Sequence, residues 1–404
     1  MCLQINTKRF YQTLLSKLVP MIEHRCILLG DQGRIFANLL RSTKRGGAPM
    51  QKEIIARNRA LSIGLDVDKK KSVIVVLDPS SGHVLFEGSL AHDEACWCSF
   101  LERFPGCRLR AFYEAGLTGF WQCRMLRRLG VDCQVVAPNA VPKEPERRQR
   151  KNDRLDAMTL ALLAVHPPRG FVRVPTEQEE DDRELIRTRE QLVKQRVRVI
   201  NQVKAKFTFH GIPMTAGARS GSDAWVKEVG ELLAERSSLG LAVTVLLDMV
   251  TALNRQMRRI EAAIRDLGRT DRFSARNARL QRIPGVGPMT AMAFLTEVFR
   301  PEEFTTSNRL ASHLGLVPTE WSSGGTSRHG HLTRWGPPHL RRLLVEAAWI
   351  WVYRDPGAQR LYLNLCRGRL RKKAIVAMAR RLVTAMWAMT VKQEEYNFHW
   401  KHAA

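Results

Sequence analysis

The sequence predicts a fold of the class α/β plus α, in which an α/β domain precedes a mostly helical region. Short β-rich runs and helical stretches alternate between residues 61 and 165, as in a mixed sheet covered by helices. Apolar pairs then recur every seven residues along residues 178–209, which is typical of a long helix. The chain after residue 272 is helical and basic in its pattern.

The mixed sheet is predicted from three consecutive strands followed by alternating helices and strands. A Pro-Ser-Ser-Gly turn at residues 79–82 separates the second strand from the third. Pro167 and Pro168 end the last helix, because proline does not continue one. The expected strands are residues 61–67, 72–77, 84–87, 109–114 and 133–136, and the expected helices are residues 93–104, 118–129 and 153–165.

The helical region begins with a heptad-spaced helix that carries basic residues between its apolar positions. Those apolar positions are Leu185, Ile186, Leu192, Val193, Val199, Ile200 and Phe207. Two interpretations remain open, namely one helix of an intramolecular bundle or a dimerising coiled coil. Residues 210–235 are expected to form a loop, and residues 239–267 a second long helix that folds back on the first.

These changes of pattern define four segments. Residues 1–55 are basic without a clear period and are expected to form an N-terminal extension, for which a start codon upstream of Met50 is one explanation. Residues 56–170 form the α/β domain, residues 171–272 the helical coiled-coil region and residues 273–404 a C-terminal domain. A chain of 404 residues is too long for one compact core, which agrees with several domains.

Composition indicates a nucleic acid as the partner. Lys and Arg number 65 against 39 Asp and Glu, which gives a formal net charge of +26 at pH 7. This excess is spread over the whole length and would attract a polyanion. With 44% hydrophobic residues, the chain can bury sizeable cores and is no disordered tail. Charge alone does not separate an enzyme from a ribosomal protein or an RNA chaperone.

The eight cysteines and the apolar segments set the expected compartment. No two cysteines have CxxC spacing, so we expect reduced thiols in a reducing cytosol and no zinc site. Residues 1–30 are interrupted by Lys, Arg, Glu and His and do not resemble a signal peptide. No apolar run is expected to reach the length needed to span a membrane. The protein is therefore expected to be soluble and intracellular.

Four acids stand where strands end and where a helix begins. Asp66 follows the first apolar run, Glu114 ends the fourth strand, and Asp153 and Asp156 are neighbours on one helix face because they are three residues apart. Carboxylates gathered there would repel one another unless divalent cations neutralised them, and hard oxygen ligands favour Mg²⁺ or Mn²⁺. Two such ions can hold the attacking and departing oxygens of a phosphodiester. Taken singly, each acid is more often a solvated surface residue, or a helix cap in the case of Asp153.

A Pro-Gly-Val-Gly-Pro segment at residues 284–288 precedes a helix rich in small residues. It looks like the hairpin of a helix-hairpin-helix element. There Gly285 and Gly287 would let the backbone approach a phosphate, which N–H groups of the next helix would hold. The alternative is a tight helix–helix turn that binds no ligand.

Two serines precede a glycine pair at residues 322–325. Such a run alone is far more often a flexible loop than a nucleophile. Nearby arginines could stabilise charge when a serine oxygen attacks phosphorus, and His329 or His331 could act as a base. The candidate nucleic-acid contacts are Arg328, Arg334, Arg341 and Arg342, and the expected core or interface anchors are Trp335, Trp349 and Trp351.

Together these motifs resemble the DEDD signature of the insertion-sequence one-ten family of transposases, relatives of the Piv invertases. They look closest to its one-eleven-eleven or one-sixteen branch, and they occur in the same order. Asn152 differs from the Thr that family members often have there. The matching blocks are residues 64–67 (Gly-Leu-Asp-Val), 113–116 (Tyr-Glu-Ala-Gly), 152–157 (Asn-Asp-Arg-Leu-Asp-Ala), 284–288, 322–325 (Ser-Ser-Gly-Gly) and 340–344 (Leu-Arg-Arg-Leu-Leu).

The resemblance implies a RuvC-like, RNase H-type domain, a coiled-coil connector and a C-terminal transposase domain with a catalytic serine. Its metal ligands for Mg²⁺ (or Mn²⁺) would be the four acids Asp66, Glu114, Asp153 and Asp156. Ser323 would be the nucleophile that links covalently to DNA, with Ser322 as the fallback.

Family members are also implied to act as dimers or tetramers on donor and target DNA, with composite sites drawn from two subunits. A noncoding bridge RNA encoded by the element is implied to guide them. The expected function is therefore a DNA recombinase that moves its own insertion sequence in the bacterial cytoplasm, associated with the nucleoid.

Two other functions fit parts of the sequence. A RuvC-like junction nuclease would keep the carboxylates, hydrolyse the strand with metal-activated water and leave Ser323 inert. A basic DNA- or RNA-binding protein without enzymatic activity would need neither the carboxylates nor the serine.

Overall fold

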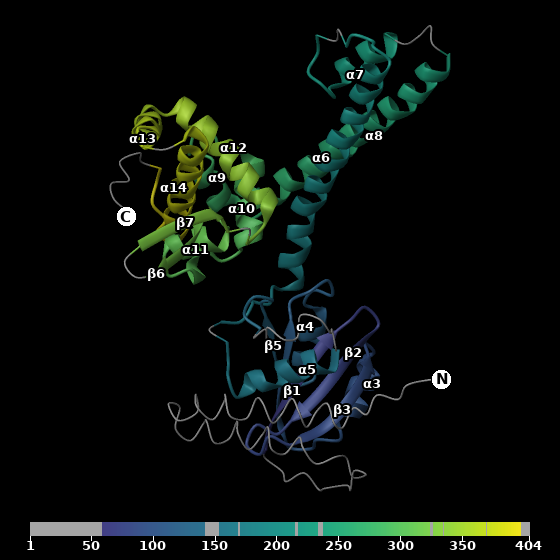
Figure 1. Ribbon diagram of the computed structural model, residues 1–404, viewed down its shortest axis with the longest axis vertical. Helices are drawn as coiled ribbons and strands as arrows, with labels where there is room; N and C mark the ends of the chain where they lie inside the picture. Colours follow the sequence, from purple (N-terminus) through teal and green to yellow (C-terminus); the bar gives the residue numbers. More distant parts are fainter. Residues whose placement is uncertain are drawn as a thin grey trace. The chain divides into compact units, whose positions relative to one another are not determined.

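The chain separates into two compact units, Met1–Pro175 and Thr176–Ala404, in a computed structural model (Figure 1). The structure describes residues 59–141, 153–168, 170–214, 217–232, 237–323, 326–333, 335–368 and 370–396. The expected N-terminal extension, residues 1–55, lies outside the described residues, as do Asn152 and Arg334.

The first unit is built on a mixed sheet, as the sequence predicts. Its strands are β1 (Ala60–Val67), β2 (Lys71–Leu77), β3 (Val84–Ala91), β4 (Arg108–Glu114) and β5 (Asp132–Val136). They lie in the order β3-β2-β1-β4-β5. β2 pairs antiparallel with both β1 and β3, whereas β4 runs parallel to β1 and β5 parallel to β4. β3 extends four residues beyond its predicted end at residue 87, because it pairs with β2 along its whole length.

Helices cover both faces of this sheet. They are α3 (Glu94–Leu101), α4 (Trp121–Arg128), α5 (Asp153–Ala161) and the short 3₁₀ helix η2 (Leu162–Ala164). The main core, which includes Ile63 of β1, Trp97 of α3 and Leu126 of α4, fills one face. On the other face α5 packs over Val75 and Phe112. Since side chains alternate along a strand, every second residue of β1 faces α5.

The second unit opens with two long helices and a short one between them. These are α6 (Glu177–Phe209), α7 (Asp223–Glu231) and α8 (Ser237–Leu267). α6 starts with a capping box, in which the Glu179 amide donates to the Thr176 hydroxyl at 3.2 Å and the Thr176 amide to the Glu179 carboxylate at 2.9 Å. The loop predicted over residues 210–235 is wrong at α7. There Trp225 and Val229 are buried against α6 and α8, contacts that the local pattern does not reveal.

Polar contacts fix how α8 lies along α6. Arg189 of α6 donates to Glu261 of α8 at 2.8 Å, and Arg196 donates to Asn254 at 2.6 Å. Apolar side chains fill the space between these contacts, with Val203 and Val250 completely buried. α6 and α8 therefore form a helix pair within one chain.

The rest of the second unit is a helical core with one β-hairpin. Its helices are α9 (Ser274–Leu280), α10 (Pro288–Val298), η3 (Pro301–Glu303), α11 (Ser307–His313), α12 (Pro338–Arg354), α13 (Pro356–Cys366) and α14 (Arg371–Val391), and its strands are β6 (Pro318–Ser323) and β7 (Thr326–Leu332). α10 and α14 carry many completely buried side chains, among them Phe294, Leu382 and Met386. Trp351 joins this core, but Trp335 and Trp349 are about half exposed.

Two described helices, α8 and α14, are long and apolar enough to span a membrane by length and composition alone. The expectation that no such stretch exists is therefore wrong. Of the apolar window in α14, 56% is buried inside the unit, against 22% in α8. A core helix of a water-soluble protein passes the same test, so both helices are weak grounds for a membrane role.

Candidate metal centre

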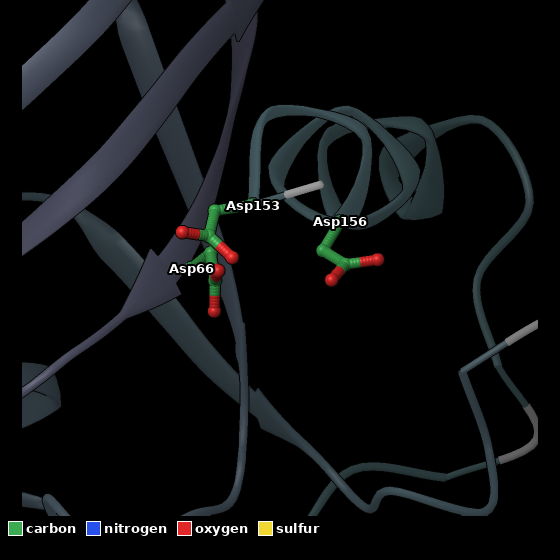
Figure 2. A group of neighbouring side chains, drawn as sticks. All are labelled: Asp66, Asp153 and Asp156. Carbon is green, nitrogen blue, oxygen red and sulfur yellow. The ribbon is translucent and has the colours of Figure 1, made fainter. Parts of the chain in front are cut away.

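Three of the four predicted acids come together where β1 ends and α5 begins (Figure 2). Asp66 is half-buried, and Asp153 and Asp156 are exposed. One carboxylate oxygen from each lies within 4.8 Å of the others. Within the described part of the chain, no other group of three or more His, Cys, Asp or Glu side chains is close enough to share a cation.

A close approach of α5 to β1 brings the three acids together. A Cβ atom on Gly64 would lie 1.9 Å from the carbonyl oxygen of Ala157 and 2.4 Å from the amide nitrogen of Ala161. Only glycine leaves room for the helix backbone there. Two residues earlier, the Ser62 hydroxyl donates to the carbonyl oxygen of Ala161 at 2.5 Å. These small residues allow α5 to lie close to β1. Sequence reasoning missed this role, although the Ser-x-Gly-x-Asp alternation along β1 indicates it.

Glu114 lies at the same edge of the sheet, but its carboxylate is not one of the three gathered. β4 runs parallel to β1 with Tyr113 opposite Leu65, so Glu114 and Asp66 end neighbouring strands. Phe112 is buried under α5, and alternate residues share a face, so Glu114 belongs to the face that α5 covers. Its side chain is exposed. Glu114 thus stands at the position from which a fourth ligand would come.

The donor set fits a hard divalent cation. All three side chains offer carboxylate oxygens, which suit Mg²⁺ and Mn²⁺ better than Zn²⁺, whose usual ligands include nitrogen and sulfur. Two of the three are exposed, so the centre is open to a large substrate. Arg154, between the two aspartates of α5, forms an ion pair with Glu87 and ties the helix start to β3.

Replacing Gly64 with alanine is expected to destabilise the first unit and to disrupt the metal centre. The added methyl group would meet helix backbone, so α5 must shift and carry Asp153 and Asp156 away from Asp66. Overpacking of this kind costs about 1–3 kcal/mol or more. Thermal unfolding measures the loss, and Gly170→Ala is the control because a Cβ there has nothing within 4 Å. Equal melting temperatures for the two variants would contradict the close packing.

Ser322 and Ser323 lie at the end of a strand, not in the flexible loop that their sequence suggests. β6 and β7 form an antiparallel hairpin in which Ser322 is opposite Ser327 and Ser323 opposite Thr326. The glycine pair at positions 324 and 325 lies outside the described residues. Arg328 belongs to β7 of the same hairpin. The hairpin was missed because its residues, rich in Ser, Thr and His, lack the alternation of a half-buried strand.

The two glycines of the predicted phosphate-binding hairpin differ in their surroundings. Gly285 has a φ of +95°, and a Cβ there would lie 2.6 Å from the carbonyl oxygen of Ala347 and 2.9 Å from the amide nitrogen of Trp351. Its missing side chain therefore serves packing against α12. Gly287 has open space at its Cβ position and precedes Pro288, the first residue of α10. Phosphate contact by either glycine stays a prediction.

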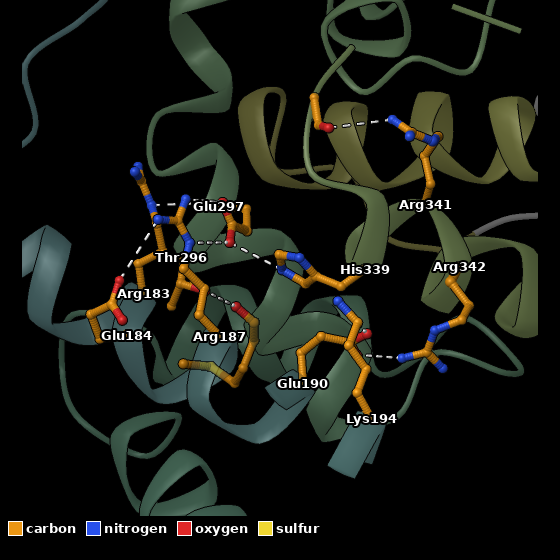
Figure 3. Close-up of polar contacts among 12 residues, drawn as sticks. Arg183, Glu184, Arg187, Glu190, Lys194, Thr296, Glu297, His339, Arg341 and Arg342 are labelled. Atoms are coloured by element: carbon orange, nitrogen blue, oxygen red, sulfur yellow. Dashed lines mark hydrogen bonds and ion pairs between the residues drawn. The ribbon is translucent and has the colours of Figure 1, made fainter. Parts of the chain in front are cut away.

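Arg341 and Arg342, two of the predicted nucleic-acid contacts, hold the second unit together (Figure 3). Arg341 donates to the backbone carbonyl oxygen of Leu314 at 3.1 Å. Arg342 forms ion pairs with Glu190 of α6 at 2.5 Å and with Glu346 of its own helix at 3.0 Å. Both guanidinium groups are thus engaged in the fold, and contact with nucleic acid stays a prediction for them.

A buried carboxylate lies where helices α6, α10 and α12 meet. Glu297 of α10 is 4% exposed and lies 3.2 Å from Arg187, 3.7 Å from Arg183 and 3.0 Å from His339 (Figure 3). Burial raises the pKa of Glu297, but hydrogen bonds from His339 and Arg187 and the charges of both arginines lower it more. The pKa of this carboxyl is therefore below its usual value. The cluster joins α6, α10 and α12.

Replacing Glu297 with glutamine is expected to destabilise the second unit by about 3 kcal/mol, because it removes the buried anion that Arg183 and Arg187 share. Since the folded-state pKa is depressed, this stabilisation is present above the ordinary pKa of 4.5 and is lost as the pH falls through the lower folded value. Urea unfolding at neutral and acidic pH measures both effects. Glu346→Gln is the control, because its exposed pair with Arg342 is worth at most about 1 kcal/mol. Equal losses for the two variants would contradict the prediction.

Two family profiles match the chain. One, described as the transposase IS116/IS110/IS902 family, matches residues 277–363. The other, a DEDD transposase profile for IS110, matches residues 63–211. The second match contains all four predicted metal ligands, and the first contains the serine hairpin.

Several bacterial proteins are similar to the chain over most of its length. The protein y4rJ of Sinorhizobium fredii, described as a transposase, is 30% identical over 81% of this chain and 91% of its own length. The transposase for insertion sequence element IS1111A of Coxiella burnetii is 29% identical over 68% of this chain and 75% of its own. The transposase for IS1328 of Yersinia enterocolitica is 26% identical over 82% and 96%.

Proposed function

The chain belongs to the IS116/IS110/IS902 family of transposases, and we propose that it cleaves and rejoins DNA strands to move its own insertion sequence. The observation that carries the proposal is the gathering of Asp66, Asp153 and Asp156 within the region that matches the DEDD profile. A family of transposases acts on DNA by cleavage and strand transfer. Metal-assisted phosphoryl transfer requires ligands such as an exposed group of carboxylates.

In this proposal the three gathered acids, with Glu114 from the neighbouring strand, hold Mg²⁺ or Mn²⁺ beside the reacting phosphate. The bound ions would supply neutralisation of the charge that develops on the phosphate oxygens. Asp66 fixes the position of the centre, because the five residues before it on β1 are buried. Asp153 and Asp156 lie in the exposed first turn of α5, and DNA would approach the metal ions from the solvent.

We place the nucleophile at Ser323, with Ser322 as the fallback. The Ser323 oxygen would form a bond to phosphorus while a deoxyribose oxygen leaves. A base, for which His329 and His331 are candidates, would take the serine proton, and the leaving oxygen would be protonated. The ester between serine and DNA replaces one phosphodiester by another, so strand rejoining needs no external energy source. The family resemblance of residues 322–325 supports this assignment.

Other molecules complete the proposal. A noncoding bridge RNA would pair with donor and target DNA, and the net charge of +26 suits such a load of polyanion. The protein would act as a dimer or tetramer with composite sites, in the bacterial cytoplasm at the nucleoid.

The recovered products test the proposal against its rivals. Purified protein is incubated with element-end DNA, target DNA, the noncoding RNA of the element and Mg²⁺. We expect rejoined strands and a protein–DNA adduct as their precursor. Free 5′-phosphate ends without rejoining would instead indicate a RuvC-like nuclease that uses metal-activated water. Binding without any change in the DNA would indicate a basic nucleic-acid-binding protein.

A further inference from the structure

The end of α12 and the adjacent face of α13 expose large apolar and aromatic side chains. Tyr353 is 86% exposed, and Trp349, one turn earlier on α12, is 46% exposed. Leu363 of α13 is 56% exposed. The Trp349 ring lies 5.6 Å from the ring of the buried Tyr362, so α12 packs against α13 beside these exposed side chains. Single exposed apolar residues are ordinary, but a group of them rimmed by charge marks an interaction surface.

Basic residues predominate beside these rings, and Glu346, the acid one turn before Trp349 on α12, is paired with Arg342. Arg360 and Leu363 share one face of α13, Arg367 follows four residues later as the C-cap of that helix, and all three are exposed. Arg354 ends α12 and is exposed as well. Between residues 354 and 373 the sequence contains one acid, Asp355. The basic residues of the same stretch are Arg354, Arg360, Arg367, Arg369, Arg371, Lys372 and Lys373.

Asp355, the one acid of this stretch, forms hydrogen bonds within the fold. A carboxylate oxygen of Asp355 accepts hydrogen bonds from the first free amides of α13, including that of Ala358 at 2.9 Å. Its other oxygen accepts from the hydroxyl of Tyr396 at 2.6 Å, and that hydroxyl accepts from the indole N–H of Trp351 at 2.7 Å. These hydrogen bonds fix the backbone where α12 meets α13. The aromatic and basic side chains beside it are therefore presented from a fixed backbone.

We infer that this surface, which we call the α12–α13 surface (Trp349, Tyr353, Arg354, Arg360, Leu363 and Arg367), binds single-stranded nucleic acid. Exposed rings stack on unpaired bases, and arginines contact the phosphates between them. A duplex keeps its bases stacked on each other and would use only the arginines. The inference rests on the proposed function, because strand exchange and guide pairing both present single strands to the protein.

Fluorescence anisotropy without divalent cations tests the inference. The probes are labelled oligothymidylate, labelled oligouridylate and a labelled duplex of equal length. The double change Trp349→Ala and Tyr353→Ala is expected to weaken binding of the single strands at least about tenfold and binding of the duplex far less. Tyr353→Phe keeps the ring and should bind as the wild type does. Leu241→Ala, at an exposed apolar position of α8, is the control.

A second set of variants tests the arginines. Changing Arg354, Arg360 and Arg367 to glutamine should reduce the salt dependence of single-strand binding by about two ion equivalents, since each phosphate contact contributes about 0.7. The control carries Arg255→Gln, Arg259→Gln and Arg265→Gln on α8, which lower the net charge equally. Equal losses for both triple variants would overturn the location of the surface.

The outcomes separate the inference from the proposed function. A larger loss with oligouridylate assigns the surface to RNA and a larger loss with oligothymidylate to DNA, and either result supports it. Unchanged binding by the aromatic double variant overturns the inference, even if that variant still cleaves and rejoins DNA. Asp66→Asn tests the metal centre alone and should bind all probes normally. Unchanged melting temperatures of the surface variants exclude misfolding as the cause of a loss.

Discussion

Asp66→Asn is expected to reduce Mg²⁺-dependent strand cleavage by about 10³-fold or more, while DNA binding stays intact. The substitution preserves the size of the side chain but removes one negative charge from the three gathered carboxylates. Asp66 is the half-buried member and extends from β1, so its position is set by the sheet. The rate is measured in single turnovers on element-end DNA, and binding is measured separately by anisotropy.

Asp68→Asn is the matched control for this experiment. Asp68 stands two residues further along, is exposed and lies outside the gathered group, so the same loss of charge should leave the cleavage rate nearly unchanged. Equal rates for the Asp66 and Asp68 variants would remove the metal centre from the mechanism. A rate that is lost together with DNA binding would indicate damage to the fold instead.

The sheet and the acids at its edge could be predicted because their signals are local. Strands β1, β2 and β4 are apolar runs with polar ends, and the side chains of Asp153 and Asp156 share a helix face by spacing alone. Their convergence with Asp66 was predicted from the family resemblance and from the need of gathered carboxylates for a shared cation. The carboxylate of Glu114 could not be placed in this way, because the direction of an exposed side chain depends on its rotamer.

Features that depend on contacts between distant segments were not predictable from local pattern. Gly285 is required for the close approach of α12, a role that its sequence context does not show, and phosphate contact by Gly285 stays a prediction. Arg341 and Arg342 were predicted as nucleic-acid contacts, and their partners within the fold lie on segments far away in the sequence, such as Glu190 on α6. α7 was missed because its buried side chains have their partners on α6 and α8. In each case the sequence shows the residue type but not the distant residue that it contacts.

Ser323→Ala is expected to abolish the covalent protein–DNA adduct while leaving DNA and RNA binding nearly intact. Alanine lacks the oxygen that the proposed mechanism bonds to phosphorus, and the change is small enough for the pairing of Ser323 with Thr326 in the hairpin to persist. The adduct is measured as DNA that stays attached to the protein on a denaturing gel. Asp66→Asn should lose the adduct as well, because in the proposal the same phosphate reacts at the metal centre.

The neighbouring serine separates a specific nucleophile from a general need for hydroxyl groups in the hairpin. Ser322 is the residue before Ser323 on β6, and in the proposal only the oxygen of Ser323 bonds to phosphorus. Ser322→Ala should therefore keep the adduct. An adduct lost with Ser322→Ala and kept with Ser323→Ala would move the nucleophile by one residue. An adduct formed by both single variants and by the double variant would refute serine chemistry, and metal-activated water would then be the nucleophile.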